Sequence, residues 1–183
     1  MERCRMVFSG SGGQGVITAA IILAEAAVLY DELTAVQTQS YGPEARGGAT
    51  RSDVIISDSE IHFPKVIQPN VLVCLTQMAY NKFSAIIRPG GLLLTDRRFV
   101  QTERKIDARQ VQIPMYQSVM DQIGKPIVFN ICMLGAVVGL TGLVRLESVA
   151  NVLEKRVPTG FLDLNRQALQ LGFDLAESYA DPS

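Results

Sequence analysis

A cluster of glycines near the start of the chain has the type and spacing of residues that hold phosphates. Positions 10–15 read G-S-G-G-Q-G and fit the pattern G-x-G-x-x-G. The cluster follows a short strand signal at 5–8 and precedes an alanine-rich helical segment at 16–30. Glycines let the main chain approach a ligand, and the first N–H groups of the following helix attract an anion. The pattern predicts either a phosphate cradle or a tight turn that only packs strand against helix.

The same pattern is half of a dinucleotide-binding fingerprint. Binding of NAD needs an acidic residue at the end of the second strand, where it holds the ribose hydroxyls. We expect that strand at 33–39, and no carboxylate stands at its end: Asp31 and Glu32 precede it, and Glu44 comes only in the next loop. A P-loop is also disfavoured, since no Lys-Ser or Lys-Thr pair follows the glycines. The residues alone leave phosphate binding and simple packing open.

A second loop rich in glycine and proline occupies positions 40–48, S-Y-G-P-E-A-R-G-G. If the strands run as expected, it leaves the same sheet edge as the first loop, where ligands of open α/β sheets collect. Arg46 could then bind a phosphate or carboxylate, with Glu44 orienting it and Tyr41 offering a stacking surface. The alternative is an exposed turn with an internal Glu44–Arg46 ion pair, which would contribute little. The candidate binding residues of both loops are Gly10, Ser11, Gly12, Gly13, Gln14, Gly15, Tyr41, Glu44, Arg46 and Gly47.

No group of side chains in the sequence indicates a catalytic centre. His62 is the only histidine, and we expect it in a hairpin in which 61–63 pair back onto a strand at 50–57. A lone histidine without a nucleophile or a carboxylate pair is more often structural than catalytic. Asp96 follows an apolar run and is expected to form a turn or to cap a helix. We therefore assign no catalytic residue to this chain.

The cysteines, the charge and the hydropathy disfavour several classes of protein. Cys4, Cys74 and Cys132 are far apart and form no C-x-x-C pair, which disfavours a zinc site or an iron–sulfur cluster held by this chain alone. We expect Cys74 and Cys132 to be small core residues of a reduced, cytoplasmic protein without a secretory leader. The 17 basic and 18 acidic residues nearly cancel, so nucleic-acid binding is not expected. The apolar stretch 127–143 falls short of a membrane span.

Alternating strand and helix signals predict one α/β domain over 1–183. Strands are expected at 5–8, 33–39, 50–57, 71–75, 92–94 and 111–113, and helices at 16–30, 77–87, 115–123, 128–141, 146–155 and 160–179. This order predicts a Rossmann-like domain of three layers, with a mostly parallel sheet, an antiparallel hairpin at its edge and a helical C-terminal part. The charged segment 100–108 is expected to be exposed. The helix at 128–141 is expected to be buried in the protein or at a subunit contact.

Taken together, the two loops resemble the signatures of one enzyme family. Positions 8–16 resemble the G-x-G-G-Q-G opening of the gamma subunits of 2-oxoacid:ferredoxin oxidoreductases, and positions 40–48 resemble their second signature. Further matches are Pro89-Gly90-Gly91 before a strand that ends in Asp96, an N-x-x-M-L-G-A helix that starts at Asn130, and the closing-helix residues Asn165, Ala168 and Gly172. The resemblance covers nearly the whole chain.

The resemblance implies a function that this chain performs only with partners. Enzymes of this family decarboxylate a 2-oxoacid on thiamine diphosphate, join the acyl group to coenzyme A and pass two electrons to ferredoxin through iron–sulfur clusters. The diphosphate motif, G-D-G followed by N, and the cluster cysteines are missing here. Thiamine diphosphate, Mg and the clusters are therefore expected in partner subunits. The gamma subunit is expected to cover the active site and to help bind coenzyme A, through the glycine loop and Arg46.

Among the substrates of this family, the resemblance favours 2-oxoglutarate over pyruvate and branched-chain 2-oxoacids such as ketoisovalerate, because a small gamma subunit without a cluster-binding domain is typical of the 2-oxoglutarate enzymes. The isolated chain is expected to be inactive and able to form a homodimer, with ferredoxin reached only through the complex. Two alternatives of other classes stay open. The chain could be a stand-alone NAD(P)-binding Rossmann protein, or a purely structural docking subunit whose glycine loop binds nothing.

Overall fold

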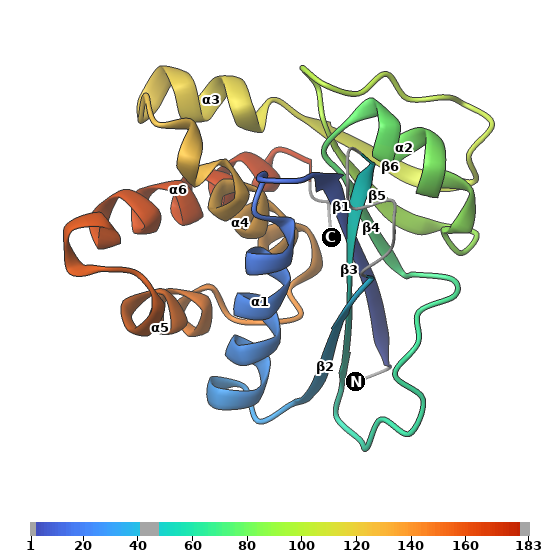
Figure 1. Ribbon diagram of the computed structural model, residues 1–183, viewed down its shortest axis with the longest axis horizontal. Helices are drawn as coiled ribbons and strands as arrows, with labels where there is room; N and C mark the ends of the chain where they lie inside the picture. The colour runs from blue at the N-terminus through green and yellow to red at the C-terminus, as the bar shows by residue number, and fades with distance from the viewer. Residues whose placement is uncertain (1–2, 41–47, 180–183) are drawn as a thin grey trace.

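The computed structural model describes residues 3–40 and 48–179, which form a six-stranded sheet with helices on both faces (Figure 1). The strand order is β2-β3-β1-β4-β5-β6. Strands β1, β4, β5 and β6 are parallel, whereas β3 is antiparallel to both β1 and β2. The strands are β1 (Cys4–Ser11), β2 (Thr34–Gln39), β3 (Ala49–Ser57), β4 (Val71–Cys74), β5 (Gly91–Asp96) and β6 (Ala108–Ile113). The expected α/β class with a mostly parallel sheet and an antiparallel edge is confirmed.

The antiparallel edge is built from other strands than the sequence suggested. Residues 61–63 were expected to pair back onto β3, but this prediction is wrong: residues 58–70 form an irregular segment. The reason is that both edges of β3 are already occupied, one by β1 and the other by β2. The side chain of His62 is consequently 79% exposed, with Nδ1 3.9 Å from a carboxylate oxygen of Glu60.

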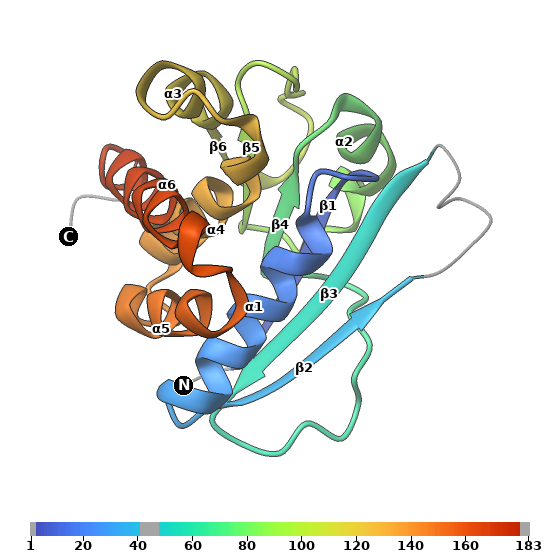
Figure 2. The same cartoon turned by 60° about the vertical axis from the view of Figure 1, so that its left-hand side comes forward.

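The helices divide into two unequal layers (Figure 2). Successive side chains of a strand point to opposite faces of the sheet, so both layers share the same strands. In β1, Met6 and Phe8 pack towards one layer and Val7 towards the other. One face of the sheet is covered by α1 (Val16–Tyr30), α3 (Met115–Gln122), α4 (Phe129–Thr141), α5 (Leu146–Arg156) and α6 (Thr159–Glu177). The other face carries α2 (Gln77–Phe83) and its 3-10 extension (Ser84–Ile86), together with loop residues. Helix α1 has the bounds that the sequence predicted.

The segment 100–108 was expected to be exposed; residues 101–107 are mostly exposed, whereas Val100 is buried and Ala108 is half-buried. Val100 is buried in the core beneath α2, and 108 already belongs to β6. The main chain turns sharply here, because the N–H groups of Phe99 and Val100 both donate to the carbonyl of Asp96. This turn brings Val100 back over the sheet.

Helix α4 lies between the sheet and α6, which explains its apolar character on all sides. Its residues Ile131 to Val138 are all buried, so the expected buried helix is confirmed. The contact with α6 is so close that a Cβ on Gly172 would lie 1.8 Å from the carbonyl oxygen of Cys132. A Cβ on Gly135 would likewise lie 2.0 Å from the carbonyl oxygen of Leu169. In the described part of the chain no helix is long and apolar enough to cross a membrane.

We predict that Gly172→Ala destabilises the protein by about 1–3 kcal/mol or more, because the added methyl group forces the backbones of α4 and α6 apart. Gly160→Ala is the matched control, since Gly160 lies in the same helix with no atom within 4 Å of its would-be Cβ. That control should be neutral or stabilising by up to about 1 kcal/mol. Urea unfolding of both variants checks this, and equal stabilities would contradict the close contact.

Candidate functional site

The two loops singled out in the sequence leave the sheet at one edge. β1 ends at Ser11, which pairs with Ala49 at the start of β3, and β2 ends at Gln39 on the other side of β3. Gly48, the described end of the second loop, therefore lies beside the glycine loop, as expected. Four candidate binding residues of the second loop lie outside the described residues, and their contacts remain predictions: Tyr41, Glu44, Arg46 and Gly47.

A cavity opens at this edge, where the chain turns to opposite faces of the sheet. β1 leads into α1 on one face, whereas the neighbouring β4 leads into α2 on the other. Such a switch point is the usual ligand position in open α/β sheets. The cavity here has a volume of about 350 Å³ and is lined by Gly10, Ser11, Gly12, Gly48, Ala49, Thr76 and Met78. This size suits part of a cofactor or a small ligand.

The glycine loop is braced from within by Gln14. Its side-chain carbonyl oxygen accepts the N–H of Ser11 at 2.7 Å, and its own N–H donates to the carbonyl of Ser11 at 3.2 Å. A Cβ on Gly10 would lie 2.5 Å from the same side-chain oxygen. In this geometry Gly10 and Gln14 hold the shape of the loop, and Gly10 also lines the cavity. Their contacts with a ligand remain predictions.

The tip of the loop is open. A Cβ on Gly12 or on Gly13 would meet nothing within 4 Å among the described residues. The φ angle of Gly13 is 85°, a conformation that other residues rarely adopt, whereas Gly12 shows no such restriction. Within residues 3–40 and 48–179, neither N–H group makes a backbone hydrogen bond. The tip can therefore present main-chain donors to a ligand.

The start of α1 completes the edge. Gly15 is the N-cap residue, with a φ of 73° and no side-chain cap, and no side chain among the described residues accepts a hydrogen bond from the first N–H groups of the helix. Asn130 in the first turn of α4 lies against this cap, and its amide nitrogen donates to the carbonyl of Gly15 at 3.3 Å. Two helices thus begin at the glycine loop, and the positive ends of both dipoles favour an anion.

Asn130 is not among the binding residues that the sequence predicts, where it appears only as the start of the N-x-x-M-L-G-A motif. Its contact joins positions 115 residues apart. The signal that could have revealed it is a polar amide in the first turn of an otherwise apolar helix.

Binding of a dinucleotide would need a free carboxylate at the end of β2. Asp53 lies opposite Thr38 in the ladder, but both of its carboxylate oxygens accept hydrogen bonds from Arg51, at 2.7 and 2.9 Å. The carboxylates of Asp31 and Glu32 stand before β2, at the far end from the cavity. No described carboxylate is therefore available at the end of β2 to hold a ribose.

The remaining candidates from the sequence are structural. Asp96 is fully buried, and its carboxylate accepts the N–H groups of Arg98 and Tyr116, each at 2.8 Å, which confirms its expected role in a turn and cap. Burial raises the pKa of Asp96 above its usual value, against the lowering effect of these hydrogen bonds. Cys74 and Cys132 are fully buried, as expected, and burial raises the pKa of each thiol to about 12. Both thiols are therefore unreactive near neutral pH.

We predict that Gly15→Ala costs about 2–4 kcal/mol of stability, from backbone strain and from overlap with Asn130. A Cβ at this position would lie 2.5 Å from the amide nitrogen of Asn130. An Asn130→Ala background removes the overlap with the amide group and leaves the backbone strain and a contact of 3.1 Å with the Cβ of residue 130, so the cost should fall to about 1–2 kcal/mol. A double-mutant cycle by denaturant unfolding measures the difference, and costs that add within about 0.5 kcal/mol would contradict the contact.

The chain matches known proteins along nearly its whole length. Residues 5–175 match the family described as pyruvate ferredoxin/flavodoxin oxidoreductase. The 2-oxoglutarate synthase subunit KorC of Methanocaldococcus jannaschii is 48% identical over 171 residues, which cover 92% of this chain and 91% of that protein.

Two solved structures share the fold. The crystal structure of a keto/oxoacid ferredoxin oxidoreductase gamma subunit from Geobacter sulfurreducens has a TM-score of 0.90 and 43% identity, covering 97% of this chain and 98% of that one. The 2-oxoglutarate:ferredoxin oxidoreductase of Magnetococcus marinus, with 2-oxoglutarate, coenzyme A and succinyl-CoA bound, has a TM-score of 0.88 and 21% identity. That match covers 100% of this chain but only 32% of the longer one. The chain belongs to the pyruvate ferredoxin/flavodoxin oxidoreductase family and is similar throughout to the gamma subunits of 2-oxoacid:ferredoxin oxidoreductases.

Proposed function

We propose that this chain is the gamma subunit of a 2-oxoglutarate:ferredoxin oxidoreductase and that its glycine loop helps to bind coenzyme A beside the active site that it covers. The observation that carries this proposal is the open tip at Gly12 and Gly13, next to the uncapped start of α1. Coenzyme A carries several phosphate groups, and main-chain N–H groups at a helix start suit such groups. Arg46 is proposed to add a positive charge from the second loop.

The choice of 2-oxoglutarate rests on similarity. The relative from Methanocaldococcus jannaschii is a 2-oxoglutarate synthase subunit, and the Magnetococcus marinus enzyme was solved with 2-oxoglutarate and coenzyme A. Pyruvate and branched-chain 2-oxoacids are the competing substrates. We propose that thiamine diphosphate, Mg and the iron–sulfur clusters are bound by sister subunits, and that ferredoxin receives electrons from the assembled enzyme in the cytoplasm.

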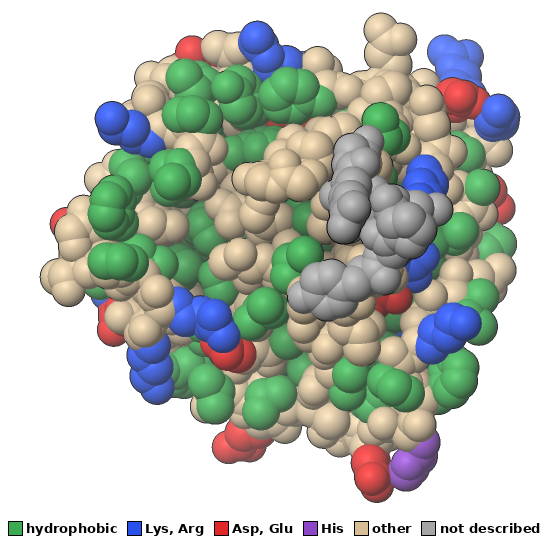
Figure 3. Space-filling model, viewed as in Figure 1, with side chains coloured by type: hydrophobic (Ala, Val, Ile, Leu, Met, Phe, Trp, Pro, Cys, Tyr) green, Lys and Arg blue, Asp and Glu red, His purple; other side chains and the backbone are tan. Residues whose placement is uncertain are grey.

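The surface of the helical layer supports a role as a subunit. Met120, Ile127 and Phe161 are 36%, 77% and 55% exposed, and they come from α3, the turn before α4, and α6. Figure 3 shows hydrophobic side chains gathered over this layer. Exposed apolar patches of this kind often mark protein contacts. On this proposal the isolated chain is inactive, and it can cover the same surface by forming a homodimer.

The two competing functions make different demands on the same edge. A stand-alone NAD(P)-binding protein needs an acid for the ribose, and the described carboxylates near β2 do not supply one. Tight binding of NAD(P)H by the purified chain would favour that function nonetheless. A purely structural subunit would need no open loop tip, and changes at Gly12 would then leave the kinetics with coenzyme A unaltered.

We predict that Gly12→Asp raises the apparent KM for coenzyme A about tenfold or more in the enzyme reconstituted with its sister subunits, because a carboxylate at the loop tip repels phosphate. Gly12→Asn is the matched control, with nearly the same shape and no charge. It should change KM by less than about threefold. The backbone at Gly12 tolerates both side chains, since it lacks a positive φ and no atom of another described residue lies within 4 Å of its would-be Cβ.

The assay uses reduction of ferredoxin with 2-oxoglutarate, pyruvate and ketoisovalerate in turn. We expect 2-oxoglutarate to give the highest kcat/KM and the isolated chain to give no turnover. Wild-type KM values for coenzyme A in both Gly12 variants would show that the loop is only a turn. A preference for another 2-oxoacid would correct the substrate and leave the loop in place.

A further inference from the structure

A second cavity lies at the opposite edge of the sheet, where β1 and β4 begin. It has a volume of about 660 Å³ and is lined by Arg5, Phe63, Lys65, Ile67, Gln68, Asn70, Arg88 and Pro89; we call it the amino-edge pocket. Arg5 stands near the start of β1 and Ser11 at its end. The two positions are six residues apart along the strand, which is about 20 Å. The amino-edge pocket is therefore distinct from the cavity at the glycine loop.

The charged side chains that line the amino-edge pocket are all positive. Arg5, Lys65 and Arg88 come from three separate segments of the chain and all line it, and its described lining contains no acidic residue. None of the three forms an ion pair with another described residue. Asp58 and Glu60, the acidic residues of segment 58–70, stand outside the lining, and the carboxylate of Glu60 faces His62. Three cations that share one hollow repel one another, so an anionic partner would stabilise them.

Three main-chain N–H groups of the lining are already occupied. The N–H of Arg5 donates to the side chain of Asn70 at 2.9 Å, and the N–H of Asn70 donates to the carbonyl of Arg5 at 2.7 Å. The N–H of Arg88 donates to the carbonyl of Pro69 at 3.1 Å. The attraction for an anion therefore comes mainly from the long charged side chains. This arrangement favours the carboxylates of a protein surface over a tightly held phosphate.

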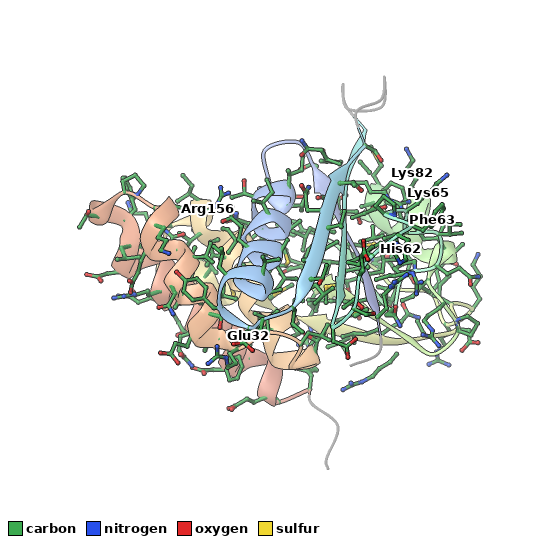
Figure 4. All side chains as sticks on the ribbon, turned by 90° about the horizontal axis from the view of Figure 1, so that it is seen from below. Glu32, His62, Phe63, Lys65, Lys82 and Arg156 are labelled. Carbon is green, nitrogen blue, oxygen red and sulfur yellow. The ribbon has the colours of Figure 1, made fainter. Side chains whose placement is uncertain are left out.

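The rim of the amino-edge pocket is apolar. Phe63 and Ile67 are 58% and 64% exposed, and both belong to the irregular segment 58–70. Figure 4 shows Phe63 and Lys65 on the side of the sheet opposite to Arg156 and the helical layer. An exposed aromatic ring beside arginines is typical of the contact residues that dominate protein interfaces. A small anion would leave both apolar side chains in water, whereas a protein segment can cover them.

We infer that the amino-edge pocket receives an acidic segment of a sister subunit. Asp or Glu side chains of that segment contact Arg5, Lys65 and Arg88, and an apolar side chain packs against Phe63 and Ile67. The inference rests on the proposed function, because it requires a multi-subunit enzyme. The Magnetococcus marinus protein supports such a setting. The match to this chain covers only 32% of that longer chain, so further polypeptide accompanies this fold there.

The first test is charge reversal. Lys65→Glu/Arg88→Glu changes two residues outside the strands and should weaken binding of the purified sister subunits by about tenfold or more, while reducing its dependence on salt. Arg104→Glu/Lys105→Glu is the matched control, since it makes the same change of charge at exposed loop positions outside both the pocket and the apolar surface of the helical layer. The control should bind within about twofold of the wild type. Thermal unfolding of each variant checks that the fold is kept.

The second test identifies the occupant. A photo-crosslinking amino acid at Phe63 in the assembled enzyme should join this chain to a sister subunit, at a peptide that contains Asp or Glu. Crosslinks to a second copy of this chain, or no crosslink at all, would overturn the inference. Equal binding by the charge-reversed and control variants would also overturn it.

The outcomes separate this inference from the proposed function. Charge reversal at the amino-edge pocket should weaken assembly and leave the KM for coenzyme A of the assembled enzyme unchanged. Gly12→Asp should leave assembly unchanged and raise the KM for coenzyme A. If the wild-type chain binds its sister subunits and the charge-reversed chain binds them equally well, only the present inference fails. If the wild-type chain binds no sister subunit, both fail.

Discussion

The pairing of β3 between β1 and β2 fixes where every loop of functional interest lies. Because β3 runs antiparallel to both neighbours, the loop that enters it stands at the end of β1, beside the glycine loop. The segment that leaves it stands at the start of β1, beside Arg5. A parallel strand at this position would exchange the two loops. One antiparallel strand in a parallel sheet thus gives each edge its own set of residues.

The buried helical layer sets the finer geometry of the carboxyl edge. α4 and α6 are in backbone contact at Gly135 and Gly172, which leaves little room for either helix to shift. The first turn of α4 carries Asn130 to the cap of α1, where it contacts Gly15. The position of the loop therefore depends on close packing that lies well inside the protein, and a change at Gly172 would be felt at the ligand edge.

Local patterns in the sequence predicted the elements well, and contacts between distant residues were the part that escaped prediction. Helix 16–30 was predicted at both ends, because the glycines before it and the charged pair after it mark its limits. The strand expected at 61–63 has a valid apolar alternation, but whether a strand forms depends on a free neighbour, and β3 has none. The burial of Val100 and the contact of Asn130 with Gly15 likewise depend on turns and packing that no local pattern encodes.

On the two proposals made above, the edges of the sheet meet negative charge by different physical means, one to bind a ligand and the other to bind a partner. At the carboxyl edge the donors are main-chain groups with fixed positions, close to two helix starts, so selectivity comes from geometry. At the amino edge the charges sit on long side chains at the surface, so their attraction reaches a partner before contact but is screened by salt. Ligand binding would consequently respond to the shape of the glycine loop, while assembly would respond to ionic strength. On these proposals a single small domain keeps ligand binding and assembly independent, because about 20 Å of β-strand separates the groups assigned to each.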